Sequence, residues 1–202
     1  MCKKFLIGGL LKFGKKEHME QLLKNGTIYM NRLSCYVLHT NEQIGDKFEK
    51  TVYSVPVKDT ITYINGKHIP TNESTGSTKI IDMGLDPFSY SMYAEYIDRI
   101  EDWENKIYID NRVFEFGNAA IIIHEPGIFL KRILSKYPKI IHRKVKYIDE
   151  NTYSGKRDFF VKSDKYEHQK EFRLAYFDNR TNKSVHKFDI GSIEDIARIE
   201  YF

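Results

Sequence analysis

One stretch near the C-terminal end, residues 165–174, gathers side chains that could do chemistry: it reads Lys-Tyr-Glu-His-Gln-Lys-Glu-Phe-Arg-Leu. If a strand begins at Glu171, then Gln169, Glu171 and Arg173 point to one face and Phe172 points to the core, because successive strand side chains alternate. A polar triad on one face of a strand can line a cleft. The alternative is a solvated face whose Glu–Arg pair contributes little energy.

The spacing Gln169-Lys170-Glu171 resembles the ADP-ribosyltransferase superfamily, in which a Gln/Glu-x-Glu stands before a late strand. The resemblance implies that Glu171 is catalytic: it would bind a ribose hydroxyl of NAD and stabilise an oxocarbenium-like transition state, which a preorganised carboxylate can do. It implies that Gln169 helps to choose the acceptor, a protein or a nucleic acid. It also implies that Lys12, on the first strand, faces the pyrophosphate, although Arg or His is usual there.

The same resemblance asks for a serine on a middle strand, and Ser34, Ser89 and Ser91 are all candidates. Tyr166 or another aromatic residue would stack on nicotinamide. Arg173, beside Glu171, is a further candidate for cofactor binding.

A wider resemblance links the chain to bacterial and phage proteins through three short segments: Gly26 to Asn31, Gly45-Asp46 with Glu49, and Tyr166 to Arg173. It implies a phage or phage-defence setting. Asp46 and Glu49 could position a ribose or bind a metal, since carboxylates in a glycine loop can converge on a cation. A surface turn is the alternative for this pair.

A basic segment, residues 131–146, could hold the phosphates of a nucleotide or of a nucleic-acid backbone. It contains no acidic residue and seven basic ones: Lys131, Arg132, Lys136, Lys139, Arg143, Lys144 and Lys146. A solvated helix face would need such charges anyway. Two further functions therefore stand beside the enzyme: a non-catalytic sponge or sensor that binds a nucleotide signal, and a nucleic-acid-binding module.

Metal and hydrolase chemistry find no support in the sequence. The seven histidines show neither His-x-His nor His-x-x-x-His spacing, and Cys2 and Cys35 lack metal-ligand spacing, so no metal site is predicted. There is no Gly-x-Ser-x-Gly elbow to support a hydrolase nucleophile. The two cysteines and the lack of a signal-peptide pattern predict a reducing, cytoplasmic location.

The composition predicts a single domain spanning residues 1–202, long enough to bury a core, with no membrane span. Aromatic residues make up 14% of the chain, which favours a strand-rich globule, and the net charge of +4 does not by itself identify a nucleic-acid binder. The predicted fold class is α+β, with a mixed, mainly antiparallel sheet resembling a split β-sandwich and a few packed helices.

The expected elements follow from periodicity and turn signals. Helices are expected at residues 16–24, ending at Gly26, at residues 96–103 and after Pro126, with a helical turn at 192–195. Asn65-Gly66 predicts a type I′ hairpin. Residues 31–50 and 70–78 are expected to be loops. The expected strands are 5–13, 27–30, 52–57, 60–64, 67–69, 88–93, 112–116, 119–123, 145–148, 159–161, 171–177, 185–190 and 197–202.

Overall fold

The computed structural model describes residues 6–37, 39–40, 45–82, 84, 86–97, 109–178 and 181–202. These described residues form three α-helices: α1 (Lys16–Asn25), α2 (Leu33–Val37) and α3 (Pro126–Lys136). The strands are β1 (Leu6–Gly14), β2 (Thr27–Arg32), β3 (Thr51–Pro56), β4 (Thr62–Ile64), β5 (Lys67–Ile69), β6 (Ser77–Ile81), β7 (Phe88–Ile97), β8 (Ala119–Ile123), β9 (Ile141–Lys144), β10 (Lys146–Ile148), β11 (Gly155–Lys156), β12 (Val161–Ser163), β13 (Glu171–Tyr176), β14 (Val185–Asp189) and β15 (Ala197–Tyr201).

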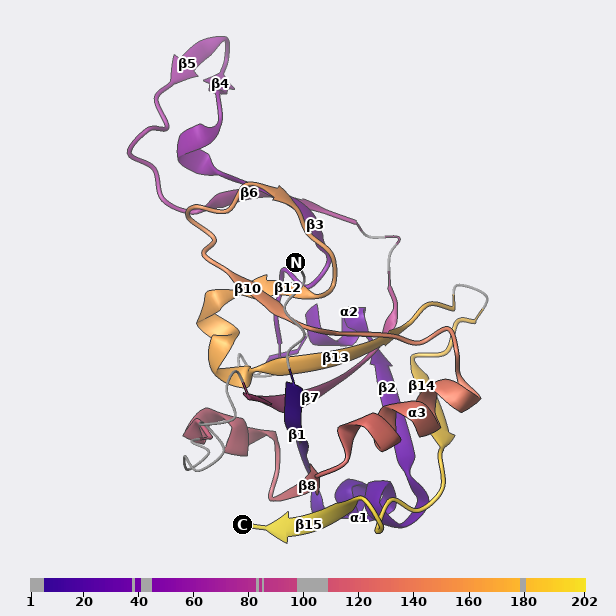
Figure 1. Ribbon diagram of the computed structural model, residues 1–202. Helices are drawn as coiled ribbons and strands as arrows, with labels where there is room; N and C mark the ends of the chain where they lie inside the picture. Colours follow the sequence, from indigo (N-terminus) through magenta and orange to yellow (C-terminus); the bar gives the residue numbers. More distant parts are fainter. Residues whose placement is uncertain are drawn as a thin grey trace.

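A large, mainly antiparallel sheet confirms the predicted α+β class. Its main path runs β14-β2-β7-β1-β8-β15, and β13 joins it by pairing with both β7 and β9 (Figure 1). Strands β3, β6 and β11 form a second, smaller sheet, and β10 pairs with β12 in parallel. The first strand thus lies in the middle of the large sheet, between β7 and β8.

Two apolar clusters lie against this sheet. The larger one packs Met19 and Leu22 of α1 and Phe129 and Ile133 of α3 against strand residues such as Leu10. The smaller one contains Leu11, Phe13, Tyr93, Val113 and Ala120. Successive residues of β1 therefore serve different clusters, as strand alternation requires.

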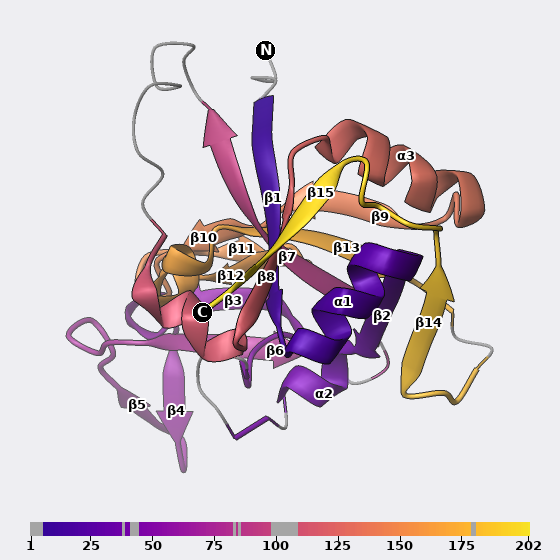
Figure 2. The same ribbon diagram turned by 90° about the horizontal axis from the view of Figure 1, so that it is seen from below.

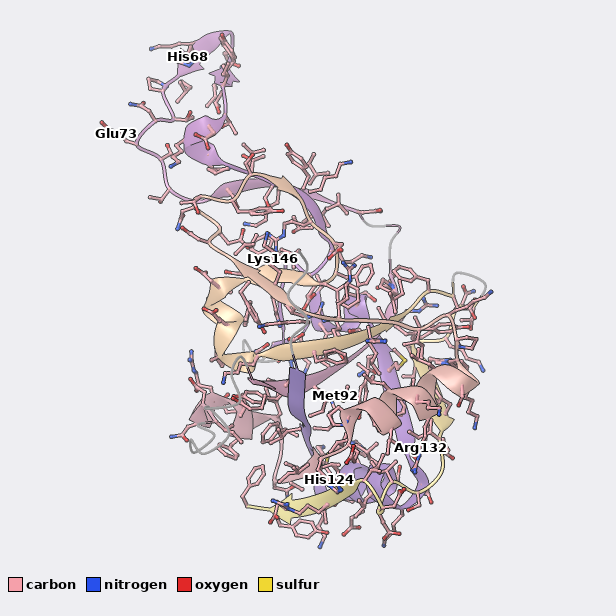
Figure 3. The ribbon with its side chains drawn as sticks, viewed as in Figure 1. His68, Glu73, Met92, His124, Arg132 and Lys146 are labelled. Carbon is pink, nitrogen blue, oxygen red and sulfur yellow. The ribbon has the colours of Figure 1, made fainter. Side chains whose placement is uncertain are left out.

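An extension built from β3, β4, β5 and β6 projects from the large sheet (Figure 1). In Figure 2 the hairpin β4–β5 lies on the opposite side of β1 from α1 and α3. Figure 3 places His68 and Glu73 towards the tip of the extension, far from Met92 in the body. The tip carries exposed apolar side chains, namely Ile61 (77% exposed), Tyr63 and Ile64.

Local sequence signals explain several boundaries. Helix α1 ends at Gly26, whose φ of 63° is left-handed and whose N–H bonds to the Leu22 carbonyl at 2.9 Å, as predicted for a glycine cap. Asn65 and Gly66 have φ of 50° and 76°, which confirms the predicted hairpin turn between β4 and β5.

Three expected elements are wrong, and the strand expected at 159–161 begins only at its last residue, Val161, where β12 starts. Residues 112–116 do not form a strand but lie in a 3₁₀ helix, η3 (Asn111–Phe116), which begins where the Asp110 carboxylate accepts the Arg112 N–H. The loop expected at residues 31–50 contains the end of β2 and helix α2. The loop expected at residues 70–78 ends early, because β6 begins at Ser77 and pairs with β3.

Two further expectations concern a helix at residues 96–103 and the absence of a membrane span. The helix expected at residues 96–103 lies mostly outside the described residues, and its first two positions, 96 and 97, end β7. None of the described helices is long and apolar enough to cross a membrane.

Candidate functional site

The site forms where two strands part along one edge of β7. Strand β1 pairs with β7 as far as Leu11 opposite Tyr93, and β2 pairs with it at Asn31 opposite Ser89. Both Tyr93 and Ser89 also pair with β13, so β1 and β2 share the other edge of β7 and leave a gap between them. The Lys12 Nζ enters this gap and donates a hydrogen bond to the Ser91 carbonyl at 2.7 Å.

A cavity of about 210 Å³ opens beside this gap. Its apolar lining comes from β1, β7 and η3: Leu11, Phe13, Met92, Tyr93, Val113 and Phe116. Its polar lining comes from β1, α2, the loop before β3, β7, β12, and the start of β13 with the residues just before it. These polar residues are Lys12, Tyr36, Glu49, Ser89, Ser91, Lys162, Gln169, Glu171 and Arg173. Five of the predicted site residues, from three distant parts of the chain, therefore line one cavity.

Glu171 is placed by an unusual backbone turn. The 3₁₀ helix η4 (Asp164–Gln169) ends at Lys170, whose φ of 39° is left-handed. This turn puts Gln169 at the end of a helix rather than on the strand, so the predicted strand alternation does not hold for Gln169. Both Gln169 and Glu171 nevertheless contact Lys162, because the turn folds them towards the same side.

The Glu171 carboxylate is held by cationic and hydroxyl donors. Its Oε1 accepts from Lys162 Nζ at 2.8 Å, and its Oε2 accepts from Arg173 Nη2 at 2.7 Å, Arg173 Nε at 3.1 Å and Ser91 Oγ at 3.2 Å. Burial alone would raise the pKa of Glu171, but the charges and hydrogen bonds of Arg173 and Lys162 outweigh it and hold the pKa well below its ordinary value. Glu171 is therefore a fixed carboxylate and not a proton donor at neutral pH.

Glu49 completes a buried ion network of four residues: Glu49, Lys162, Glu171 and Arg173. The Arg173 guanidinium meets both Glu49 oxygens at 2.8 Å, and Lys162 Nζ lies 3.6 Å from Glu49 Oε1. Lys162 also donates to Gln169 Oε1 at 2.9 Å. Burial would lower the pKa values of Lys162 and Arg173, but Glu171 and Glu49 raise both above their ordinary values. Two cations and two carboxylates thus balance.

Lys12 is the cation left over when this network is balanced. Its Nζ lies 4.5 Å from the centre of the Tyr90 ring. Burial lowers the pKa of Lys12 to about 8, and the negative charge of Glu171 offsets only part of the effect. Tyr36, on α2, also lines the cavity, and burial raises its pKa to about 12, so its phenol is neutral.

Tyr166 and Asp46 are buried near the network but are not among the cavity-lining residues. Tyr166 donates from its hydroxyl to the Gly45 carbonyl at 3.0 Å, and Lys162 Nζ lies 4.4 Å from its ring centre. Asp46 Oδ1 accepts the Phe48 N–H at 2.9 Å, and burial followed by the charge of Glu49 raises the pKa of Asp46. Both residues hold the loop that carries Glu49.

The candidate serines separate clearly. Ser89 and Ser91, two residues apart on β7, both line the cavity. Ser34 lies elsewhere, where its hydroxyl donates to Asp86 Oδ2 at 2.8 Å. Of the three candidate serines, Ser89 and Ser91 therefore lie on β7 at the cavity, and Ser91 Oγ donates to Glu171 Oε2.

The basic segment does not line the cavity. Arg132, in α3, pairs with Asp195, and Arg143, in β9, pairs with Asp158 at 2.8 Å. Figure 3 places Arg132 on α3 and Lys146 near the smaller sheet, so the segment spreads over different parts of the surface.

Sequence reasoning missed Lys162 and Tyr36. Lys162 lies between Val161 and Ser163 on a short strand, and nothing in the sequence distinguishes it from the many other lysines. The structure does distinguish it, because its side chain is only 3% exposed. Among the described residues, no group of three or more His, Cys, Asp or Glu side chains converges as a metal site would require. Comparisons of this chain with protein-family models, with curated proteins and with solved structures found no match.

Proposed function

We propose that this chain is an ADP-ribosyltransferase-like enzyme that binds NAD, or a related nucleotide, with its reacting end in the cavity. One observation carries the proposal: Lys12 of β1, Ser91 of β7 and the pair Gln169 and Glu171 before and at the start of β13 line the same cavity. These are the positions that a Gln-x-Glu transferase would use, and they come together from residues up to 159 positions apart.

The electrostatics support a role for Glu171 in stabilising positive charge. A carboxylate whose pKa is held low stays ionised while a cationic sugar develops beside it, and preorganised charge is an effective catalyst in a buried site. Its Oε1 is contacted by Lys162 at 2.8 Å, while the other three donors share Oε2, so Oε1 is the oxygen better placed to accept a ribose hydroxyl.

The size of the cavity limits which part of the ligand enters. Pockets for drug-sized ligands usually measure about 300–1,000 Å³. A cavity of about 210 Å³ suits a single ring with part of a ribose, and its apolar lining suits a flat ring such as nicotinamide. The remaining phosphates and adenosine would lie outside. Lys12 is the cation of the polar lining that is not paired with Glu49 or Glu171 in the described structure.

A second candidate is a non-catalytic binder of a nucleotide signal. The observation that favours it is that each charged residue of the ion network is paired with an opposite charge. Rigidly paired charges suit a binding surface as well as a catalytic one. A ligand present at 100 times its Kd adds about 2.7 kcal/mol of stability. Either function therefore predicts a rise in Tm of about 5–10 °C with millimolar NAD, but the binder returns NAD unchanged.

The test compares Glu171→Gln with Glu49→Gln in an assay of nicotinamide release from NAD. Both variants remove one negative charge from the same buried network, so both lower stability. Only Glu171→Gln should lower turnover specifically, by about 100-fold or more, since it removes the carboxylate beside the reacting sugar. Melting curves identify a temperature at which both variants are folded. Equal activities of the two variants would contradict the role of Glu171.

A further inference from the structure

Two lysines reach the same cavity in opposite electrostatic settings. Lys162 Nζ lies 2.8 Å from a Glu171 oxygen and 3.6 Å from a Glu49 oxygen, and its side chain is 3% exposed. Lys12 Nζ instead contacts the Ser91 carbonyl at 2.7 Å and the face of the Tyr90 ring. Among the residues that the structure describes, no carboxylate oxygen lies within ion-pair distance of Lys12 Nζ.

These contacts suit a neutral amine as well as an ammonium ion. A neutral amine can still donate one N–H to the Ser91 carbonyl while its lone pair stays available. An ammonium ion at this half-buried place has lost part of its hydration without gaining a paired anion, which is costly. Lys162 has the opposite balance, because its two carboxylate partners favour the charged form.

We propose that Lys12 is a nucleophile that captures a small, ring-bearing aldehyde in this cavity as an imine. Amine nucleophiles that form imines with carbonyl compounds are lysines placed in apolar or otherwise desolvated pockets. The apolar lining, with Phe13, Tyr93 and Phe116, accommodates the ring, and the volume of about 210 Å³ limits the ligand to about one ring.

The reaction balances without a further reagent. The lone pair of Lys12 Nζ attacks the aldehyde carbon, a C–N bond forms, and the carbonyl π bond becomes a hydroxyl that takes a proton from nitrogen. The hydroxyl then takes a proton from solvent and leaves as water, while the nitrogen lone pair forms the C=N bond. The nitrogen keeps its second proton, so the product is the protonated imine. Nothing is oxidised or reduced. The protonated imine is a cation, and the ionised Glu171, which already interacts electrostatically with Lys12, would stabilise it.

The fraction of Lys12 that is neutral sets the rate of imine formation. The charged and titratable groups around it on the cavity are Tyr36, Glu49, Tyr93, Lys162, Glu171 and Arg173, with Tyr90 beneath it. With a pKa of about 8, close to a tenth of Lys12 is neutral at pH 7. For an exposed lysine of pKa 10.4 the neutral fraction is about 200-fold smaller. Capture should therefore be selective at pH 7 and level off above pH 8.

The experiment treats the full chain with pyridine-3-carboxaldehyde and cyanoborohydride at pH 7, then maps the labelled peptides by mass spectrometry. Reduction of the imine leaves a stable pyridylmethyl amine. We expect Lys12 to be labelled at least tenfold faster than exposed lysines such as Lys131, and faster than Lys162. The terminal amino group, whose ordinary pKa is about 7.7–8.0, serves as the internal reference for a free amine. Mapping the unaltered protein decides the matter without any variant.

Two variants then locate the reaction. Lys12→Arg keeps the charge but removes the nucleophile, and it should lose this label, whereas Lys131→Arg should keep it. Labelling spread evenly over exposed lysines, or centred on Lys162, would overturn the inference. Because the readout is covalent labelling, it does not depend on NAD turnover: an inactive but selectively labelled chain would contradict the proposed transferase only, and an active but unlabelled chain would contradict only the nucleophile.

Discussion

Arg173 shows how a large cation can be buried in this protein. Its side chain is 2% exposed, yet Glu49 and Glu171 both contact its guanidinium, and the Phe159 carbonyl accepts a further hydrogen bond. Removing one partner of a buried pair leaves a charge uncompensated and typically costs about 3–5 kcal/mol. The four-residue ion network is thus one unit, and changes to any member should affect the stability of the whole site.

Lys12 should make stability depend on pH in a predictable direction. Its pKa is about 8 in the folded protein and about 10.4 in an unfolded chain, so between these values the unfolded chain binds more protons. The free energy of unfolding must then rise with pH in this window. Lys12→Met removes the effect: from pH 7 to 9.5, we expect wild type to gain about 1–2 kcal/mol relative to the variant.

The measurement is urea unfolding of both proteins at the two pH values. Lys131→Met provides the control, because Lys131 is exposed and its loss should not change the pH dependence. If wild type and Lys12→Met keep the same difference in unfolding free energy at both pH values, Lys12 is not buried as an uncompensated amine.

At the level of helices and strands, sequence patterns predicted what depends on neighbours along the chain. The apolar run of β8, the glycine that ends α1 and the Asn-Gly hairpin are all set locally, and all three are confirmed. Residues 112–116 were misassigned because Val113 and Phe116 are three positions apart and therefore share one face of a 3₁₀ helix, in which residues i and i+3 eclipse. Strand β9, with residues Ile-His-Arg-Lys, was missed because its polar side chains are mostly exposed while its backbone pairs with β13.

The candidate site was predictable only in part, because sequence patterns show what depends on neighbours along the chain and not which distant residues meet. Gln169 and Glu171 were predicted from residue type and spacing, Lys12 only from the resemblance to the ADP-ribosyltransferase superfamily, and all three line one cavity. The pairing of Lys162 with Glu171 and of Arg173 with Glu49 could not be read from the chain. The second pair joins positions 124 residues apart through tertiary structure alone.

Gly26 gives a test of how tightly α1 is joined to the C-terminal segment. A Cβ at Gly26 would lie 2.1 Å from the Gly191 carbonyl oxygen, and its φ of 63° already disfavours other residues. Gly191 itself has φ of 86° but open space around it. Gly191→Ala should therefore cost only the left-handed backbone, about 1–2 kcal/mol.

Gly26→Ala should cost at least about twice as much as Gly191→Ala, because the backbone overlap adds to the same conformational penalty. Chemical denaturation of the two variants under one set of conditions measures the difference. Equal losses would mean that the two segments separate easily.

At the scale of the whole molecule, the outer part of the extension, residues 57–76 between β3 and β6, is the part least connected to the rest. Strands β4 and β5 pair with each other at its tip, and the chain enters and leaves through Val57 and Gly76, whose backbone groups are joined by a 3.0 Å hydrogen bond. A two-stranded hairpin alone is marginally stable in water. The exposed apolar residues at the tip add no packing to the two clusters of the body.

Replacing residues 58–75 by an Asn-Gly turn should therefore leave the body intact, since that turn can close the hairpin of β3 and β6. We expect the Tm to change by less than about 3 °C and the variant to keep whatever rise in Tm millimolar NAD gives the unaltered protein. Thermal unfolding followed by near-UV circular dichroism checks both. Loss of a cooperative transition would mean that the extension is needed for folding of the body.

The central position of β1 also determines when the site can exist during synthesis. Strand β1 is made before its partners: β7 and β8 come about 80 and 110 residues later, and Glu171 and Arg173 later still. Domains commonly fold as the chain emerges, and long-range strand pairing is slow. A nascent chain therefore holds Lys12 without its cavity until β13 has been made, and any prematurely terminated product ending before β13 would lack Glu171 and Arg173 of the cavity lining.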